Sequence, residues 1–229
     1  MIITIDGPVA TGKSTIARKL AESLGFIYFD TGAMYRAATY SILKQGVNIE
    51  ENEALDTFLG QFNFDIKIRR GHKHYYVNEE DVTSAIRSHE VTQAVSRVAA
   101  VKAVRNKLVA IQRQFAVGVN AVFEGRDMGT VVFPDADLKI YLTGSLDVRA
   151  QRRFEEIQRE RPDDSRDLTL EEVKEDIEER DHIDTTRDVS PLSKAKDAYT
   201  VDTTDLSLDE VVFQIFECKD RVKSRSKQS

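Results

Sequence analysis

A segment near the N-terminus carries the clearest chemical pattern in the chain. Residues 7–15 contain the pattern G-x-x-x-x-G-K-[ST] and read Gly7, Pro8, Val9, Ala10, Thr11, Gly12, Lys13, Ser14 and Thr15. In this pattern, glycines let backbone N–H groups close around phosphate oxygens, Lys13 reaches the terminal phosphates and the Ser14 hydroxyl ligates Mg²⁺. A purely structural glycine turn does not require lysine and serine together after the second glycine. We therefore predict a loop that binds nucleotide phosphates.

A second candidate segment begins at Asp30. A phosphate-binding loop alone does not distinguish a GTP switch, an ATPase motor and a small-molecule kinase, so a binding site for a second substrate must be sought elsewhere in the chain. The segment follows the second predicted strand, and open α/β sheets place ligands at the carboxyl ends of their strands. The Thr31 hydroxyl and the Arg36 guanidinium suit an acceptor phosphate. A capped helix with Arg36 in solvent is an equally weighted alternative.

Two further clusters join acidic and basic side chains. Arg126 and Asp127 follow a predicted strand, so they emerge at the same sheet edge as the phosphate-binding loop. Arg180, Asp184 and Arg187 lie at i, i+4 and i+7, which places them on one face of a helix. A solvated ladder of ion pairs is the alternative for this second cluster.

Hydrophobic spacing predicts the elements that position these residues. Short apolar runs predict strands, and three- and four-residue apolar spacing with glycine stops predicts the helices between them. The predicted strands cover residues 2–5, 26–29, 121–123, 139–142 and 199–202, with helices from 14 to 24, from 35 to 45 and from about 207. Strand and helix alternate, which favours an α/β fold with a five-stranded parallel sheet and helices on both faces.

Three segments depart from this alternation. Residues 62–78 alternate apolar and polar side chains on both sides of a turn, which predicts an antiparallel hairpin inserted into the core. Residues 91–115 carry apolar side chains at helical spacing, which predicts one long amphipathic helix. Residues 149–166 hold six arginines and the helix breaker Pro162, and we interpret them as a mobile, arginine-rich lid.

Composition excludes several classes of protein. The 229 residues carry a net charge of −6, so a broad basic surface for polymeric nucleic acid is not expected. No apolar run approaches the ~18 residues of a membrane span, and the N-terminal residues do not resemble a secretory leader. Cys218 is the single cysteine, which favours a reducing, cytoplasmic setting. The four histidines have no metal-ligand spacing, so we assign none of them to a metal.

These motifs together resemble the bacterial cytidylate kinase family, the (d)CMP kinases of the nucleoside monophosphate kinase group. The resemblance covers essentially the whole chain. It rests on the phosphate-binding loop and on residues 30–36, 125–136, 179–187 and 201–204. It implies transfer of the γ-phosphoryl group of ATP to CMP or dCMP with Mg²⁺, by a monomer.

The resemblance also implies a division of the chain. A P-loop kinase core would comprise residues 1–58 and 98–229, with the lid at about 150–168. An insert that binds the nucleoside monophosphate would comprise residues 59–97 and contain the small antiparallel sheet.

Residue roles follow from the same resemblance. Residues 7–15 would bind ATP, and the catalytic set would be Lys13, Arg126, Arg187, Arg149 and Arg153. CMP would be bound by Thr31, Tyr35, Arg36, Ser96, Arg105, Arg126, Asp127, Arg180 and Asp184. Cytosine offers an amino donor to a carboxylate and ring acceptors to an arginine, and uracil reverses this pattern. UMP should therefore be the poorer substrate.

Three alternatives remain open from the sequence. The acceptor can be UMP, AMP or a metabolite hydroxyl. A GTP-binding switch would need a guanine-reading N-K-x-D motif, which the sequence lacks. An inactive relative of the kinases is the third alternative, and the intact Lys13, Ser14, Arg126, Asp127 and Asp184 argue against it.

Overall fold

The computed structural model describes the chain except for residue 51, residues 161–167 and residues 227–229. Its contacts divide the chain into two compact units. One unit comprises Met1–Phe29 and Gly118–Ser229, and the other comprises Asp30–Val117. The monophosphate-binding role of residues 59–97 stays a prediction.

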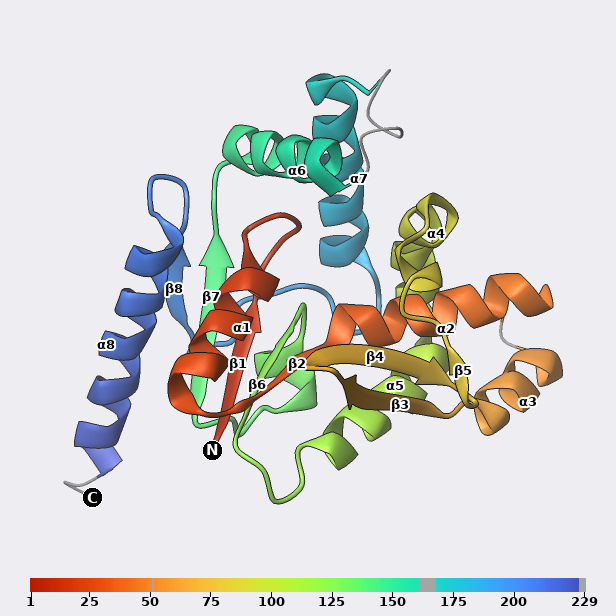
Figure 1. The fold of residues 1–229 in the computed structure, drawn as a ribbon, viewed down its shortest axis with the longest axis horizontal. Helices are drawn as coiled ribbons and strands as arrows, with labels where there is room; N and C mark the ends of the chain where they lie inside the picture. Colours follow the sequence, from red (N-terminus) through yellow and green to blue (C-terminus); the bar gives the residue numbers. More distant parts are fainter. Residues whose placement is uncertain (51, 161–167, 227–229) are drawn as a thin grey trace. The chain divides into compact units, whose positions relative to one another are not determined.

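The first unit is built on a five-stranded parallel sheet, as the sequence predicts. The strands are β1 (Ile2–Asp6), β2 (Ile27–Asp30), β6 (Ala121–Gly125), β7 (Leu138–Thr143) and β8 (Tyr199–Asp202). Their order is β2-β6-β1-β7-β8, so β1 lies at the centre, between β6 and β7 (Figure 1). The carboxyl end of β1 therefore emerges beside those of its two neighbours.

Helices flank this sheet because their apolar faces cover its side chains. They are α1 (Lys13–Leu24), α6 (Leu146–Glu160), α7 (Leu170–Thr186) and α8 (Leu208–Ser226), with a π-helical turn, η2, at Met128–Val132. Ile16 and Leu20 of α1 and Ile215 of α8 are buried in one cluster with Ile3 and Ile140 of the sheet. Burying each such side chain contributes roughly 1.5–3 kcal/mol, which holds both helices on the strands.

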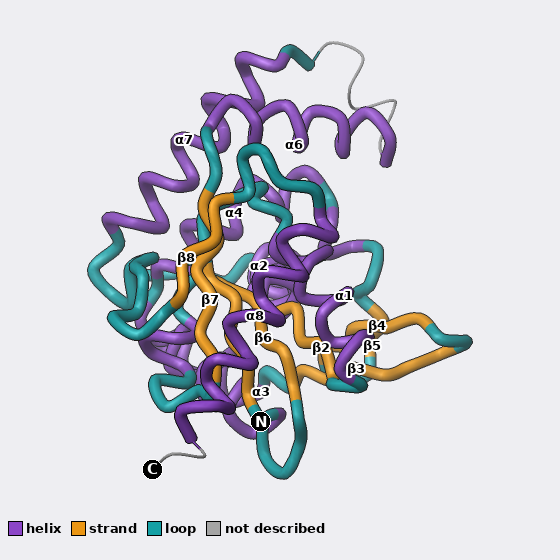
Figure 2. Tube along the Cα trace, turned by 90° about the vertical axis from the view of Figure 1, so that its left-hand side faces the viewer, coloured by secondary structure: helices purple, strands orange, loops and turns teal. Residues whose placement is uncertain are grey.

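Helices α6 and α7 pack against each other (Figure 2). Ala150, Val173 and Ile177 form a small core together with Val9 of the phosphate-binding loop. The predicted lid begins in α6, which is helical to Glu160, and its residues 161–167 lie outside the described residues. Its mobility stays a prediction.

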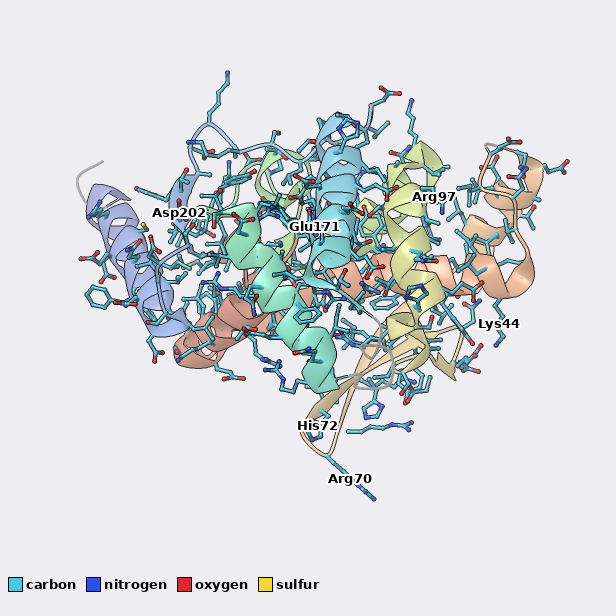
Figure 3. All side chains as sticks on the ribbon, turned by 90° about the horizontal axis from the view of Figure 1, so that it is seen from above. Lys44, Arg70, His72, Arg97, Glu171 and Asp202 are labelled. Carbon is cyan, nitrogen blue, oxygen red and sulfur yellow. The ribbon has the colours of Figure 1, made fainter. Side chains whose placement is uncertain are left out.

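The second unit contains the predicted antiparallel hairpin. Strands β3 (Phe64–Arg69) and β4 (His72–Val77) pair in antiparallel register, and the short β5 (Glu80–Asp81) extends the sheet. Arg70 and Gly71 have φ angles of 51° and 80°, the conformation that a tight type I′ turn requires. Figure 3 labels Arg70 and His72 at this tip.

Helices surround the small sheet and complete the second unit. They are α2 (Thr31–Gln45), α3 (Glu53–Gln61), α4 (His89–Ala100) and α5 (Lys102–Phe115), with a 3₁₀ turn, η1, at Ala85–Arg87. Their buried faces share one core, to which Ile42, Leu55, Phe64 and Leu108 contribute.

The prediction of one long helix over residues 91–115 is wrong. Val101 adopts an extended backbone, with φ −71° and ψ 122°, and separates α4 from α5. Apolar spacing continues across the break, since Val98 and Val104 are both buried. Periodicity alone therefore does not reveal the bend.

Helix α3 is an element that the apolar spacing does not predict. Asn52 caps it, because its side-chain oxygen accepts a hydrogen bond from the Leu55 N–H at 3.0 Å. Leu55, Phe58 and Leu59 are buried on its inner face. The helix has little more than two turns, so its apolar pattern is too short to stand out.

Among the described helices, none combines the length and the apolar character that crossing a membrane requires.

Candidate active site

The phosphate-binding loop joins β1 to α1 and needs glycine at its first position. Gly7 has a φ of +151°, and a Cβ there would lie 2.2 Å from the Leu142 carbonyl oxygen. Gly12, with φ +83°, precedes the first residue of α1. The loop therefore leads directly into a helix N-terminus, where free N–H groups favour an anion.

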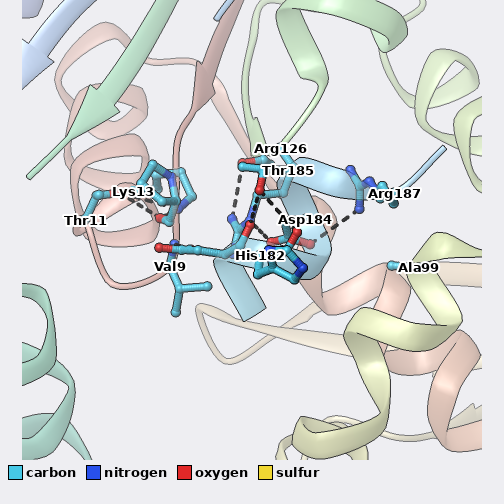
Figure 4. A network of polar contacts seen from close by, with 12 residues as sticks. Val9, Thr11, Lys13, Ala99, Arg126, His182, Asp184, Thr185 and Arg187 are labelled. Carbon is cyan, nitrogen blue, oxygen red and sulfur yellow. Dashed lines mark hydrogen bonds and ion pairs between the residues drawn. The ribbon is translucent and has the colours of Figure 1, made fainter. Parts of the chain in front are cut away.

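Lys13 lies folded back over this loop. Its Nζ donates to the Pro8 carbonyl oxygen at 2.5 Å and lies 3.4 Å from Thr11 Oγ1 (Figure 4). Burial, followed by the charge of Arg126, lowers the pKa of Lys13 to about 7, against the opposing effect of Glu124 and other nearby carboxylates. An ammonium in this setting gains strongly from an additional anion.

Ser14 faces a carboxylate that the sequence analysis did not single out. Its Oγ donates to Glu124 Oε1 at 2.6 Å, and the Tyr28 hydroxyl donates to the same oxygen at 3.3 Å. Glu124 lies near the end of β6, directly before Gly125 and Arg126. An acidic residue inside an otherwise apolar strand, next to a cationic motif, is the signal that could have identified it.

The donor set around Ser14 fits a magnesium ion. Mg²⁺ prefers oxygen ligands, and it usually takes only one or two from the protein while phosphates and water supply the rest. Ser14 and Glu124 offer a hydroxyl and a carboxylate within hydrogen-bond distance of each other. Among the described residues, no group of three or more His, Cys, Asp or Glu side chains is placed to hold a metal.

Asp6 is a second carboxylate that the sequence analysis did not single out. Its two oxygens accept hydrogen bonds from the Met128 and Gly129 N–H groups, each at 2.8 Å. Burial raises its pKa to about 6, although both hydrogen bonds act in the opposite direction. Asp6 thus fixes the turn that follows Arg126 and Asp127.

Arg126, Asp184 and Arg187 form one polar network (Figure 4). Arg126 Nε donates to Asp184 Oδ2 at 2.7 Å, and Arg187 NH1 approaches Asp184 Oδ1 at 3.5 Å. Asp184 lies near the end of α7, and Arg187 is the residue that ends this helix. The structure therefore brings these three predicted residues together.

Charge determines the protonation of this network. Burial acts to raise the pKa of Asp184, but the charge and hydrogen bond of Arg126 outweigh it, so the pKa lies below its usual range. Burial, reinforced by the charge of Arg126, lowers the pKa of the nearby Arg180 guanidinium. Lys13, Arg126, Arg180 and Arg187 thus place four cationic side chains together among the carboxylates of Glu124, Asp181 and Asp184, and arginines grouped in this way favour a phosphate ligand.

The two arginines assigned to the lid have different partners. Arg149 NH1 donates to Asp181 Oδ2 at 2.6 Å and to the Val9 carbonyl oxygen at 2.9 Å, which places it against the phosphate-binding loop. Arg153 NH1 donates instead to Glu156, one turn along α6, at 2.7 Å. Asp181 was not among the predicted site residues.

The remaining predicted residues belong to the second unit, apart from Asp127, which is buried in the first. Thr31 and Tyr35 are buried on α2, which Asp30 caps by accepting from the Ala33 N–H at 2.9 Å. Arg36 is partly buried, and its NH1 donates to Thr92 Oγ1 at 2.8 Å.

Arg105 is the largest fully buried side chain of the second unit, with 2% of its surface exposed. Its NH1 donates to the Ala99 carbonyl oxygen at 3.0 Å, and its guanidinium lies over the Tyr35 ring, 5.2 Å from the centroid. Ser96 is buried on α4. Thus Tyr35 and Arg105, two of the predicted CMP-binding residues, are in direct contact.

Comparison with known proteins shows which family the chain belongs to. The family model described as "Cytidylate kinase" matches residues 3–221. The cytidylate kinase of Protochlamydia amoebophila is 59% identical over 98% of this chain and 99% of its own length. The cytidylate kinase of Shouchella clausii is 43% identical, over 99% of this chain and 97% of its own length.

A solved structure supports the fold alone. An uncharacterized protein from Eubacterium ventriosum superposes with a TM-score of 0.50 at 14% identity, and the match covers 96% of this chain and 98% of the other. The sequence matches carry the family assignment, because they extend over nearly the whole chain at high identity. The chain belongs to the cytidylate kinase family.

Proposed function

We propose that the protein transfers the γ-phosphoryl group of ATP to CMP or dCMP, which gives ADP together with CDP or dCDP. The observation that carries this proposal is the cationic group of Lys13, Arg126, Arg180 and Arg187 beside the phosphate-binding loop, in which Lys13 and Arg187 are buried and the other two side chains are partly buried. Membership of the cytidylate kinase family supports the choice of acceptor.

The donor side consists of residues 7–15 and Mg²⁺. Backbone N–H groups of the loop and of the α1 N-terminus bind phosphate oxygens, and Lys13 neutralises charge on the β- and γ-phosphates. Ser14 would hold Mg²⁺, with Glu124 at hydrogen-bond distance from the same hydroxyl, and the bound ion would neutralise charge on the phosphates.

The acceptor side follows the residues predicted from the sequence. Thr31, Arg36 and Arg126 bind the acceptor phosphate, and Tyr35 packs beside it. Arg180 and Asp184 bind the sugar hydroxyls, and Ser96, Arg105 and Asp127 contact cytosine. The contact between Arg105 and Tyr35 supports this grouping, because the guanidinium is held in place before CMP arrives.

Catalysis then rests on position and charge. The acceptor phosphate is already anionic, so the reaction requires no general base. Arg126, Arg187, Arg149 and Arg153 neutralise charge that spreads over the transferred group, and effects of this kind supply most of the rate in phosphoryl transfer. A lid at about residues 150–168 would exclude water and limit hydrolysis of ATP.

A coupled assay of ADP release tests the reaction. ATP and Mg²⁺ are supplied with CMP, dCMP, UMP, AMP or no acceptor, and we expect rapid turnover with CMP and dCMP and weak turnover with UMP. Strong turnover with another acceptor would keep the kinase and reject the assignment of Arg105 and Asp127. Turnover that does not depend on an acceptor would reject the proposal.

The oligomeric state and the cellular setting are parts of the same proposal. We propose a monomer that works in the cytoplasm, where the lone thiol of Cys218 stays reduced. Light scattering coupled to size-exclusion chromatography should give the mass of one chain, 25.9 kDa. A mass near twice this value would contradict the monomer.

A further inference from the structure

Two side chains, Arg149 of α6 and Asp181 of α7, bind the backbone of Val9 within the phosphate-binding loop. The Val9 N–H donates to Asp181 Oδ1 at 3.0 Å, and the Val9 carbonyl accepts from Arg149 NH1 at 2.9 Å. The same nitrogen of Arg149 donates to the second oxygen of Asp181 at 2.6 Å. One carboxylate thus bridges a loop N–H group and a guanidinium.

The Val9 N–H and Arg149 NH1 are donors that could bind a phosphate oxygen in place of the Asp181 carboxylate. Backbone N–H groups of such a loop and a nearby guanidinium both favour anionic acceptors, and charge-assisted hydrogen bonds of this kind are the stronger ones. Asp181 also acts on Lys13, since its charge favours the protonated form of that lysine. Asp181 therefore supplies negative charge to three groups suited to binding phosphate.

Arg149 would keep its position if Asp181 moved away. Its Nε donates to the Gly144 carbonyl oxygen at 3.0 Å, in addition to the contact of NH1 with Val9. Two backbone acceptors thus hold the guanidinium beside the loop. The carboxylate can be exchanged for another anion without loss of the arginine from the site.

We propose that Asp181 is an internal competitor of ATP: its carboxylate occupies the Val9 N–H and Arg149 in the free enzyme, and the phosphate chain of ATP replaces it. This inference rests on the proposed function. Asp181 therefore lowers the affinity for ATP, and Arg149 binds the nucleotide once the phosphates have displaced this carboxylate. No covalent bond is made or broken in this exchange, because one anion replaces another as the hydrogen-bond acceptor of the same donors.

Titration of the full-length protein with MgATP, in the absence of CMP, tests the competition. In Asp181→Asn the acceptor is neutral, so we expect the Kd for ATP to fall roughly three- to tenfold. Glu175→Gln is the matched control, because it removes one negative charge from an exposed position on the same helix, and its Kd should stay within about twofold of the unchanged protein. An equal or higher Kd in Asp181→Asn would overturn the inference.

A second measurement needs no variant. The ¹³C signal of the Asp181 carboxyl and the ¹⁵N–¹H signal of Val9 are recorded in the unchanged protein with and without MgATP. We expect both to move on binding, because the carboxyl loses the Val9 N–H and Arg149 together. An Asp181 carboxyl signal that stays in place while ATP binds would show a structural contact and overturn the inference. If MgATP fails to bind the unchanged protein, the proposed function fails first.

Discussion

Arg126 and Asp184 are bound to each other in the structure, with 2.7 Å between Nε and Oδ2, although the first follows β6 and the second belongs to α7. Both are predicted to bind CMP, one through its phosphate and one through its sugar. The pair therefore holds two parts of the proposed acceptor site in register before any substrate binds. Asp184 also places a negative charge beside Arg126 and Arg187, which offsets the cost of removing their guanidinium groups from water.

Removal of the Asp184 charge should destabilise the protein. In Asp184→Asn, Arg126 and Arg187 lose their anionic partner, and breaking a buried pair in this way costs about 3–5 kcal/mol. The free energy of unfolding in urea measures the loss. Asp188→Asn, an exposed position on the same segment, is the control and should change stability by less than about 0.5 kcal/mol. A loss below about 1 kcal/mol in Asp184→Asn would contradict the prediction.

Arg105→Met should weaken the use of CMP more than the use of ATP. The substitution removes a charged donor predicted to bind the cytosine acceptors, which is worth about 1.5–3 kcal/mol, or a rise in the KM for CMP of roughly ten- to a hundredfold. The KM for ATP should change little. Steady-state kinetics with each substrate varied in turn make this measurement.

Arg97→Met provides the control for that experiment. Arg97 lies exposed on α4 of the same unit and is labelled in Figure 3. Its replacement changes the same charge without touching the buried group, so both KM values should stay the same. A parallel rise in both KM values for Arg105→Met would instead indicate a general loss of structure.

Two glycine substitutions should have opposite effects on stability. Gly60 lies inside α3, and a Cβ added there would meet no heavy atom within 4 Å, so Gly60→Ala should stabilise the protein by about 0.5–1 kcal/mol through lower backbone entropy of the unfolded chain. At Gly7 the backbone and the Leu142 carbonyl exclude a Cβ, so Gly7→Ala should cost more than about 2 kcal/mol. Thermal unfolding distinguishes the two, and a gain at Gly7 would be incompatible with the loop geometry.

Asp6 should make stability depend on pH. Its pKa is raised from 3.8 to about 6 in the folded protein, so between these values the folded state binds more protons than the unfolded state. The contribution of Asp6 is therefore fully present below about pH 4 and is lost as the pH rises through 6, by an amount on the order of 3 kcal/mol. Urea unfolding of the unchanged protein and of Asp6→Asn across this range isolates the effect. A stability difference between them that does not vary with pH would refute it.

The sequence was sufficient to predict the parallel sheet, the hairpin and the phosphate-binding loop. Each depends on a local pattern: alternation over residues 62–78, short apolar strands, and the spacing of Gly7, Gly12 and Lys13. The bend at Val101 could not be predicted in this way, because a break of one residue leaves the apolar spacing nearly intact.

Three carboxylates of the candidate site could not be predicted from the sequence, for a different reason. Asp6, Glu124 and Asp181 are distant from their partners in sequence, and their importance lies in the groups they contact: Gly129, Ser14 and the backbone of Val9. Nothing in the spacing of single acidic residues identifies such contacts, since tertiary structure creates them. The motif therefore predicted the loop, whereas the carboxylates that contact the site could be identified only from the structure.

The central position of β1 has a consequence for the order in which the chain folds during synthesis. Ile2 pairs with Ala121 of β6, and Ile3 pairs with Leu138 of β7, so β1 leaves the ribosome long before either of these neighbours in the sheet. Residues 30–117, by contrast, are continuous in sequence and share one core. Slow formation of such distant pairings is expected, and the apolar β1 is exposed to association with other chains in the interval. A nascent chain halted before residue 121 should therefore depend more on chaperones than one halted after residue 202.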